Sequence, residues 1–137
     1  MKPNSRLSLA FRALIQMSCN ADRAVTSARL AHQTKTNPVV VRRVLGRLRE
    51  AGIVASERGH SGGWWLVRDP TCVTLADVYV ALEQRLVTAP PTAKIKMCSI
   101  ERALQDRMSD IKTDIEASLI ARLSDTTLAD IQETARL

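Results

Sequence analysis

Three arginines on one predicted helix, Arg42, Arg43 and Arg47, are the residues whose type and spacing most clearly suggest a chemistry. A guanidinium group can bind phosphate oxygens or the edge of a guanine base. Val39 lies one turn earlier and can contact a thymine methyl group. The alternative interpretation is an ordinary solvated helix face, because arginines are frequent on protein surfaces.

A second candidate set lies in a glycine-rich loop and comprises Arg58, His60, Ser61, Gly62 and Gly63. Backbone amides and a guanidinium group at such a tip can hold a phosphate or enter a minor groove. The histidine has no acid or nucleophile at a recognisable spacing, so a solvated loop histidine is the simpler interpretation of that residue.

The remaining candidate chemistry belongs to Cys98, which follows Lys94 and Lys96 and precedes a predicted long helix. Nearby cations and a helix N-terminus favour a thiolate, so Cys98 is a candidate redox-responsive thiol. An inert cysteine at the edge of an interface is the alternative. Neither His32 nor His60 is near it in sequence and no oxyanion-forming loop is apparent, so we expect no enzyme and no catalytic residues.

The arginines require a helix over residues 38–51. Asn37 can cap this helix, Pro38 suits its first position, and Gly52 supplies a left-handed stop. At about 100° per residue its apolar side chains share one face, which predicts the buried set Val41, Val44, Leu45 and Leu48. Gly46 lies on the other face, where a glycine lowers helix stability by roughly 1 kcal/mol relative to alanine. A glycine at this position suggests that another surface approaches the helix closely there.

Two helices are expected before the arginine-bearing one. Leu7, Phe11 and Leu14 recur at three- and four-residue spacing and predict a helix over residues 5–19. Thr26 can cap a short helix that ends near Thr34. The order of these elements is that of a helix-turn-helix.

A β-hairpin is expected next, with strands near residues 53–55 and 64–67 and the glycine-rich loop between them. Period-two alternation places Trp64 and Leu66 on one side and Trp65 on the other. One tryptophan should close the core. Trp65 is left over, and it either packs on a neighbouring helix or lies exposed near a bound nucleic acid.

The charge of the chain is divided between its halves. Residues 1–70 hold twelve Lys/Arg against four Asp/Glu, a balance of +8, whereas residues 71–137 have a balance of −2, which together give +6. The basic half contains the helix-turn-helix and hairpin, as expected if it neutralises phosphates. Charge that merely keeps the domain soluble is the alternative.

Length and composition exclude several classes of protein. A chain of 137 residues suits one compact domain with a small helical arm, and three scattered cysteines do not form a disulfide framework. There is no apolar run of the roughly 18 residues that a membrane span needs, and no secretory signal pattern. We therefore expect a cytoplasmic protein without membrane association.

The chain resembles a known family in three collinear segments, Val41–Val54, Ser56–Leu66 and Thr74–Glu83. They are similar to winged-helix repressors typified by the iron–sulfur regulator IscR, the nitric-oxide sensor NsrR and the cysteine regulator CymR. Asn4–Leu7 and Thr36–Arg43 further resemble its YwnA-like members. The resemblance extends from Asn4 to Glu83, a span of more than half of the chain, and the junction of helix, hairpin and following helix is its most specific part.

This resemblance implies a homodimer on double-stranded DNA with a roughly palindromic operator. The third helix would occupy the major groove and the hairpin tip the minor groove, with half-sites about 34 Å apart. The resulting DNA-binding candidates are Thr26, Ser27, Asn37, Pro38, Val39, Arg42, Arg43, Arg47, Arg58, His60, Ser61, Gly62 and Gly63.

A long helical arm follows the hairpin region. Thr74 and Asp77 predict a capped helix that ends near residues 83–85, and two adjacent prolines make residues 86–98 a linker. A helix over residues 99–123 carries an apolar stripe at spacings of 4, 4, 3, 4 and 4: Ile100, Leu104, Met108, Ile111, Ile115 and Leu119. We expect this stripe to form a dimer interface, the alternative being an arm folded back on its own domain. Thr127 should cap a last helix near the first one.

The cofactor expectation depends on the number of cysteines. Relatives with an iron–sulfur cluster supply three cysteines between linker and arm, where this chain has Cys98 alone, and Cys19 and Cys72 match no ligand position of the family. A single thiolate cannot hold a cluster that usually needs four ligands, so we expect no cluster, no other cofactor and no metal.

The sequence therefore predicts a mainly α fold with a small β-hairpin. Residues 1–85 form a winged helix-turn-helix domain, 86–98 a linker, and 99–137 a dimerisation helix with a C-terminal helix. The predicted function is a sequence-specific transcriptional repressor that acts as a homodimer and responds to thiol oxidation at Cys98. A regulator that senses an unknown small ligand, and a dimeric interaction protein that has lost DNA binding, remain as alternatives.

Overall fold

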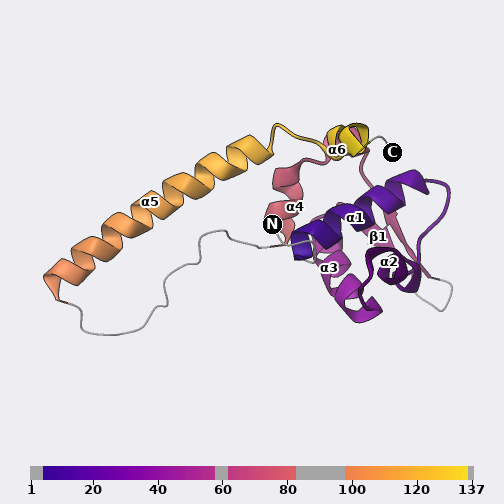
Figure 1. Cartoon of the computed structure of the whole chain (residues 1–137), viewed down its shortest axis with the longest axis horizontal. Helices are drawn as coiled ribbons and strands as arrows, with labels where there is room; N and C mark the ends of the chain where they lie inside the picture. The colour runs from indigo at the N-terminus through magenta and orange to yellow at the C-terminus, as the bar shows by residue number, and fades with distance from the viewer. Residues whose placement is uncertain (1–4, 58–61, 83–97, 136–137) are drawn as a thin grey trace.

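A computed structural model gives the fold of residues 5–57, 62–82 and 98–135 (Figure 1). Its elements in chain order are α1 (Arg6–Cys19), α2 (Ser27–Thr34), α3 (Pro38–Glu50), β1 (Val54–Ser56), β2 (Trp64–Leu66), the 3₁₀ turn η1 (Pro70–Cys72), α4 (Leu75–Ala81), α5 (Ser99–Leu123) and α6 (Leu128–Ala135). The predicted mainly α fold with one hairpin is confirmed. Arg58, His60, Ser61 and all of the linker except Cys98 lie outside the described residues.

Side-chain caps set where the helices begin. The hydroxyl of Thr26 accepts a hydrogen bond from the amide of Arg29 at 3.1 Å, and the amide oxygen of Asn37 accepts one from Val40 at 3.0 Å. These bonds satisfy amides that have no partner within the helix. Thr74 and Asp77 form the predicted reciprocal capping box, although α4 ends at Ala81, short of the predicted 83–85.

The core forms where α1, α2 and α3 pack together. The four apolar residues of α3 predicted to be buried are buried, and they contact the apolar face of α1 that carries Leu9, Ala13 and Leu14. Gly52 ends α3 with a φ of 75°, a conformation that glycine adopts without steric cost. The predicted stop is therefore confirmed.

The hairpin is an antiparallel pair in which Val54 lies opposite Leu66 and Ser56 opposite Trp64. Val25, just before α2, adds a bridge to the free edge of β2 through two hydrogen bonds with Trp64, of 2.9 and 2.8 Å. The hairpin is thereby fastened to the connection between α1 and α2.

The C-terminal helix α6 returns to the winged helix. Leu128 is fully buried, its amide donates to the carbonyl of Val73 at 2.7 Å, and the amide side chain of Gln132 donates to the Ser18 hydroxyl at 2.9 Å. The predicted position of the last helix near α1 is confirmed. The core of the DNA-binding domain thus includes residues from the far end of the chain.

The long helix α5 projects away from the other helices (Figure 1). It has 25 residues, which corresponds to a length of about 37 Å, and none of them is buried. Its apolar stripe lies open over most of its length, with Ile100 78% and Leu104 62% exposed. The arm is not folded back on its own domain. None of the helices in the described ranges has the combination of length and apolarity needed to cross a membrane.

Candidate nucleic-acid interface

The exposed face of α3 carries the residues predicted to read DNA. Val39 is 57% exposed, and both Arg42 and Arg43 project into solvent. Arg47 lies half-buried at the edge of the same face. The burial of the opposite face fixes the rotation of α3, so these side chains point outward together.

Gly46 leaves a flat place in the middle of this face. A Cβ atom added there would meet no atom within 4 Å. The close approach predicted for Gly46 therefore has no partner in the described part of the chain. A helix surface without a side chain at this point can come nearer to an external wall, such as that of a DNA groove.

The predicted contacts at the N-termini of α2 and α3 are partly occupied within the protein. Thr26 and Asn37 cap their helices, and the hydroxyl of Ser27 accepts a hydrogen bond from the indole N–H of Trp64 at 2.9 Å. Ser27 thus holds the hairpin against α2. Pro38 occupies the first position of α3, as predicted.

Arg49 of α3, which the sequence analysis does not single out, joins this helix to the hairpin. Its guanidinium carbon lies 5.3 Å from the ring centroid of Trp64, and its Nη1 donates a hydrogen bond to the hydroxyl of Ser56 at 2.8 Å. Arg49 thus connects α3 to Trp64 of β2 and to Ser56 of β1. The indole of Trp64 connects β2 in turn to Ser27 of α2. The helical period places Arg49 at the border of the buried face of α3, and this position could have indicated a contact within the protein.

The described glycines of the hairpin tip have different roles. Gly63 is buried, and an added Cβ would lie 2.9 Å from the Cβ of Ala24 and 3.0 Å from the backbone of Val25. Glycine is required at Gly63 by this close approach inside the protein. Gly62 is half-buried, and the other three residues of the predicted tip are outside the described ranges.

A basic hollow beside the turn between α2 and α3 was not predicted. It measures about 120 Å³ and is lined in part by Arg6, Arg12 and Lys35. Arg12 donates to the carbonyl of Thr34 at 2.8 Å, which holds α1 against the end of α2. Lys35 adopts the left-handed conformation, with a φ of 56°, that turns the chain towards α3. These cations enlarge the positive surface next to α3.

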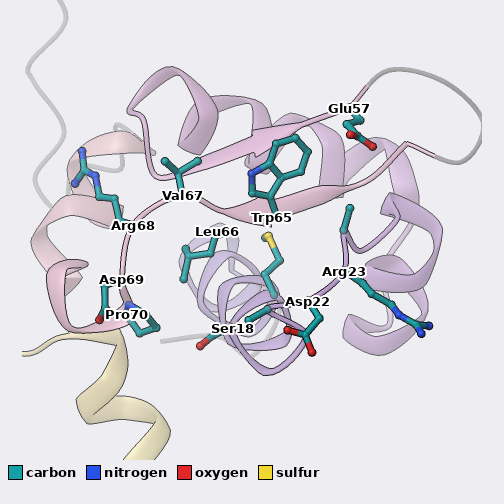
Figure 2. A pocket seen from close by; sticks show the side chains of 13 residues that line it. Ser18, Asp22, Arg23, Glu57, Trp65, Leu66, Val67, Arg68, Asp69 and Pro70 are labelled. Atoms are coloured by element: carbon teal, nitrogen blue, oxygen red, sulfur yellow. The ribbon is translucent and has the colours of Figure 1, made fainter.

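Trp65 lies on the other face of the hairpin from Trp64. It is half-buried and borders a groove of about 580 Å³ that also contains Met17 of α1 (Figure 2). We call this hollow the Trp65 groove, and its lining residues are Met17, Ser18, Ala21, Asp22, Arg23, Ala24, Glu57, Trp65, Leu66, Val67, Arg68, Asp69 and Pro70. Trp65 is therefore neither buried like Trp64 nor fully exposed.

The three cysteines are exposed and lie in three different elements. Cys98 is the N-cap of α5, where its sulfur accepts a hydrogen bond from the amide of Glu101 at 3.5 Å. Among residues 5–57, 62–82 and 98–135, no three His, Cys, Asp or Glu side chains are grouped as metal ligands. This donor set does not fit an iron–sulfur cluster, which needs several thiolates in one place.

A helix-turn-helix with a basic exposed face, followed by a β-hairpin, defines the class of winged-helix DNA-binding proteins. A family model described as "Rrf2: Iron-dependent Transcriptional regulator" matches residues 4–134. The chain belongs to the Rrf2 family of winged-helix transcriptional regulators, and it is a DNA-binding regulator of that kind.

Known relatives agree with this assignment. The chain is 30% identical to YwnA of Bacillus subtilis, named as an HTH-type transcriptional regulator, over 93% of this chain and 95% of that one. A crystal structure described as that of a DNA-binding protein matches with a TM-score of 0.76 and 28% identity, and covers 93% of this chain and 99% of that one. CymR of B. subtilis, called the global cysteine regulator, has a TM-score of 0.62 and 21% identity over 98% of both chains, and shows the same fold.

Proposed function

We propose that the protein is a homodimeric repressor of transcription that binds a two-fold symmetric operator. In each half-site α3 occupies the major groove and the hairpin tip lies over the neighbouring minor groove. The observation that carries this proposal is the outward face of α3, where Arg42 and Arg43 flank the bare surface at Gly46. Arginines beside a flat helix surface suit close contact with phosphates and guanine edges.

The support for a dimer comes from α5. Five large apolar side chains of this helix are about half exposed or more, which a soluble monomer would have no reason to keep in one stripe: Ile100, Leu104, Met108, Ile111 and Ile115. A second copy of the same helix covers them at the smallest structural cost. Two-fold symmetry of the dimer then requires two similar half-sites, about 34 Å apart.

We further propose that the two helices pair antiparallel, an arrangement that the order of spacings in the stripe allows. The series 4, 4, 3, 4, 4 reads the same in both directions, so a two-fold axis near residues 109 and 110 places Leu104 opposite Ile115 of the partner subunit. The same rule places Met108 opposite Ile111 of the partner subunit. Each apolar side chain then meets another, which a shifted register would not achieve.

The signal that controls DNA binding is proposed not to be an iron–sulfur cluster, although the family description names iron. The reason is the donor set, since Cys98 is a single exposed thiol at a helix N-terminus. We propose oxidation of this thiol as one input. Its position at the start of α5 would let a change there alter the packing of the dimer arms.

Selection of bound sequences from a random pool of double-stranded DNA tests the proposal directly. We expect reduced protein to enrich a palindromic motif with half-sites one helical turn apart. Protein with Arg42→Ala and Arg43→Ala together should enrich no motif under the same conditions. A dimeric interaction protein that has lost DNA binding would enrich nothing in either form, and that result would reject the repressor function.

A further inference from the structure

The Trp65 groove is large enough for a small organic molecule and has no part in the proposed DNA contacts. Its volume of about 580 Å³ falls within the range of about 300–1,000 Å³ typical of small-molecule sites. The groove runs between the C-terminal end of α1, residues 21–24, and the segment from β2 to Pro70 (Figure 2). It is too small to hold a folded partner.

The inner wall of the groove is apolar and partly aromatic. Met17, Trp65, Leu66 and Val67 all border the groove. In Figure 2 the side chains of Trp65 and Val67 lie on one side of β2 and that of Leu66 lies on the other. Val67 is 56% exposed and Trp65 is only half-buried, so apolar surface remains open to a ligand. An aromatic face of this kind attracts cations as well as apolar groups.

The charged residues that line the groove are three carboxylates and two arginines. Asp22, Glu57 and Asp69 are exposed at its rim. The hydroxyl of Thr71 donates to Asp69 at 2.6 Å and its amide donates at 2.8 Å, and these bonds hold the pKa of Asp69 below its ordinary value. Asp69 therefore keeps its negative charge to a lower pH than an ordinary aspartate does.

The two arginines that border the groove do not cancel this charge at the indole. Arg68 donates to the carbonyl of Ala51 at 3.1 Å and lies 3.8 Å from the carboxylate of Asp77, both on other elements. Figure 2 shows the side chains of Arg23 and Arg68 pointing away from Trp65. An anionic ligand would thus meet carboxylates without a guanidinium group directed at it.

We propose that the Trp65 groove binds a small organic cation, with its aromatic or alkyl body against Trp65 and its positive charge towards the carboxylates of the rim. An indole face, an apolar wall and acidic neighbours are the combination that recognises ammonium ligands of this type. A neutral molecule of the same shape lacks the attraction to the carboxylates, and an anion is repelled by them.

The groove adjoins the contact that fastens the hairpin to α2. Val25 and Trp64 exchange two backbone hydrogen bonds there, and Gly63 packs against Ala24 with no room for a side chain. A ligand held between residues 21–24 and β2 therefore lies next to these contacts and can shift the hairpin relative to α2. This part of the inference rests on the proposed function, and binding of the ligand itself does not.

Binding is tested without DNA, by titrating the protein with three probes of similar size: benzyltrimethylammonium, neutral N,N-dimethylbenzamide and anionic phenylacetate. We expect the cation to bind about tenfold or more tightly than either of the others, as the loss of one charge interaction implies. In ¹H–¹⁵N spectra the indole signal of Trp65 should shift more than that of Trp64. Equal affinity for the three probes would overturn the proposal.

Three variants locate the site. Trp65→Leu should abolish detectable binding of benzyltrimethylammonium, and Glu57→Gln should weaken it about threefold to tenfold. Glu133→Gln removes an exposed carboxylate of α6 outside the groove and should leave the affinity unchanged. Full affinity in a Trp65→Leu protein with an unchanged circular dichroism spectrum would contradict the assignment.

The effect on DNA is measured separately, with the operator obtained by selection. We expect saturating benzyltrimethylammonium to change the operator affinity of the wild-type protein by at least threefold and that of Trp65→Leu by less than its error. No change in the wild-type protein would reject the coupling. A protein that binds the cation and no DNA would reject the proposed function and leave the groove assignment standing.

Discussion

Arg49 of the recognition helix lies over the indole ring of Trp64 in the hairpin, with 5.3 Å between its guanidinium carbon and the ring centroid. The same guanidinium group donates a hydrogen bond to Ser56, and the indole donates one to Ser27. One cation and one aromatic ring thus join the recognition helix to the hairpin and to α2. The angle between the two proposed DNA-binding elements depends on this contact.

Replacement of Arg49 by alanine should lower the free energy of unfolding by about 1 kcal/mol. The loss combines an exposed cation–π contact with one side-chain hydrogen bond. Urea denaturation followed by fluorescence measures it, and Arg49→Lys should lose less because the cation remains over the ring. Arg42→Ala is the matched control, since its solvent-facing position predicts a change within about 0.5 kcal/mol. An equal loss in Arg42→Ala would contradict this interpretation.

An exposed arginine of α3 should matter for DNA affinity rather than for the free energy of unfolding. Arg43→Ala is expected to reduce operator affinity and, if the contact is to a phosphate, to lower the slope of log K against log salt by about 1. Fluorescence anisotropy at several salt concentrations measures both quantities. Arg102→Ala, on the exposed surface of α5, should leave the slope unchanged. Identical slopes for wild type and Arg43→Ala would remove Arg43 from the list of phosphate contacts.

The features that could be predicted from the sequence are those set by neighbouring residues. The caps at Thr26 and Asn37 each bond to an amide three positions later, and the stop at Gly52 depends on its own backbone conformation. The outward direction of the α3 arginines follows from the helical period once the apolar face is known. Local spacing alone therefore defines the bounds and the outward face of α3.

The features that could not be predicted depend on contacts between distant segments. Gln132 bonds to Ser18 across 114 positions, and Trp64 pairs with Val25 although Val25 belongs to no predicted helix or strand. Gly63 shows the consequence, because its place in a glycine-rich loop suggested a nucleic-acid contact, whereas its close neighbour Ala24 is brought to it only by the fold. Residue type alone could not separate these two reasons for a glycine.

Gly63 and Gly46 should respond in opposite ways to alanine. Gly63→Ala forces a Cβ to within 3.0 Å of the backbone of Val25 and should destabilise the fold by about 1–3 kcal/mol. Gly46→Ala meets open space in a helix and should stabilise the fold by roughly 1 kcal/mol. If α3 enters a DNA groove, the Gly46→Ala protein should nevertheless bind its operator more weakly. Thermal unfolding and anisotropy together check the pair, and destabilisation of both variants would contradict the structural distinction.

Oxidation should act on DNA binding through Cys98 if this thiol is the input. Treatment with peroxide is expected to lower the operator affinity of the wild-type protein and to have no effect on Cys98→Ser, because serine keeps the cap of α5 but cannot be oxidised in this way. The double variant with Cys19→Ser and Cys72→Ser is the control and should respond like wild type. A full response in Cys98→Ser would assign the effect to another group.

The antiparallel register of α5 can be tested by cross-linking. In a background where all three natural cysteines are serine, Leu104→Cys combined with Ile115→Cys should give a covalent dimer on mild oxidation, because the proposed axis places these two positions opposite each other. Leu104→Cys alone should not cross-link: the two copies of residue 104 would be offset by 11 residues, about 16 Å along the helix, whereas a disulfide needs Cα atoms within about 7 Å. Non-reducing electrophoresis distinguishes the two results. Efficient cross-linking of the single variant would instead indicate a parallel pair, in which like positions face each other.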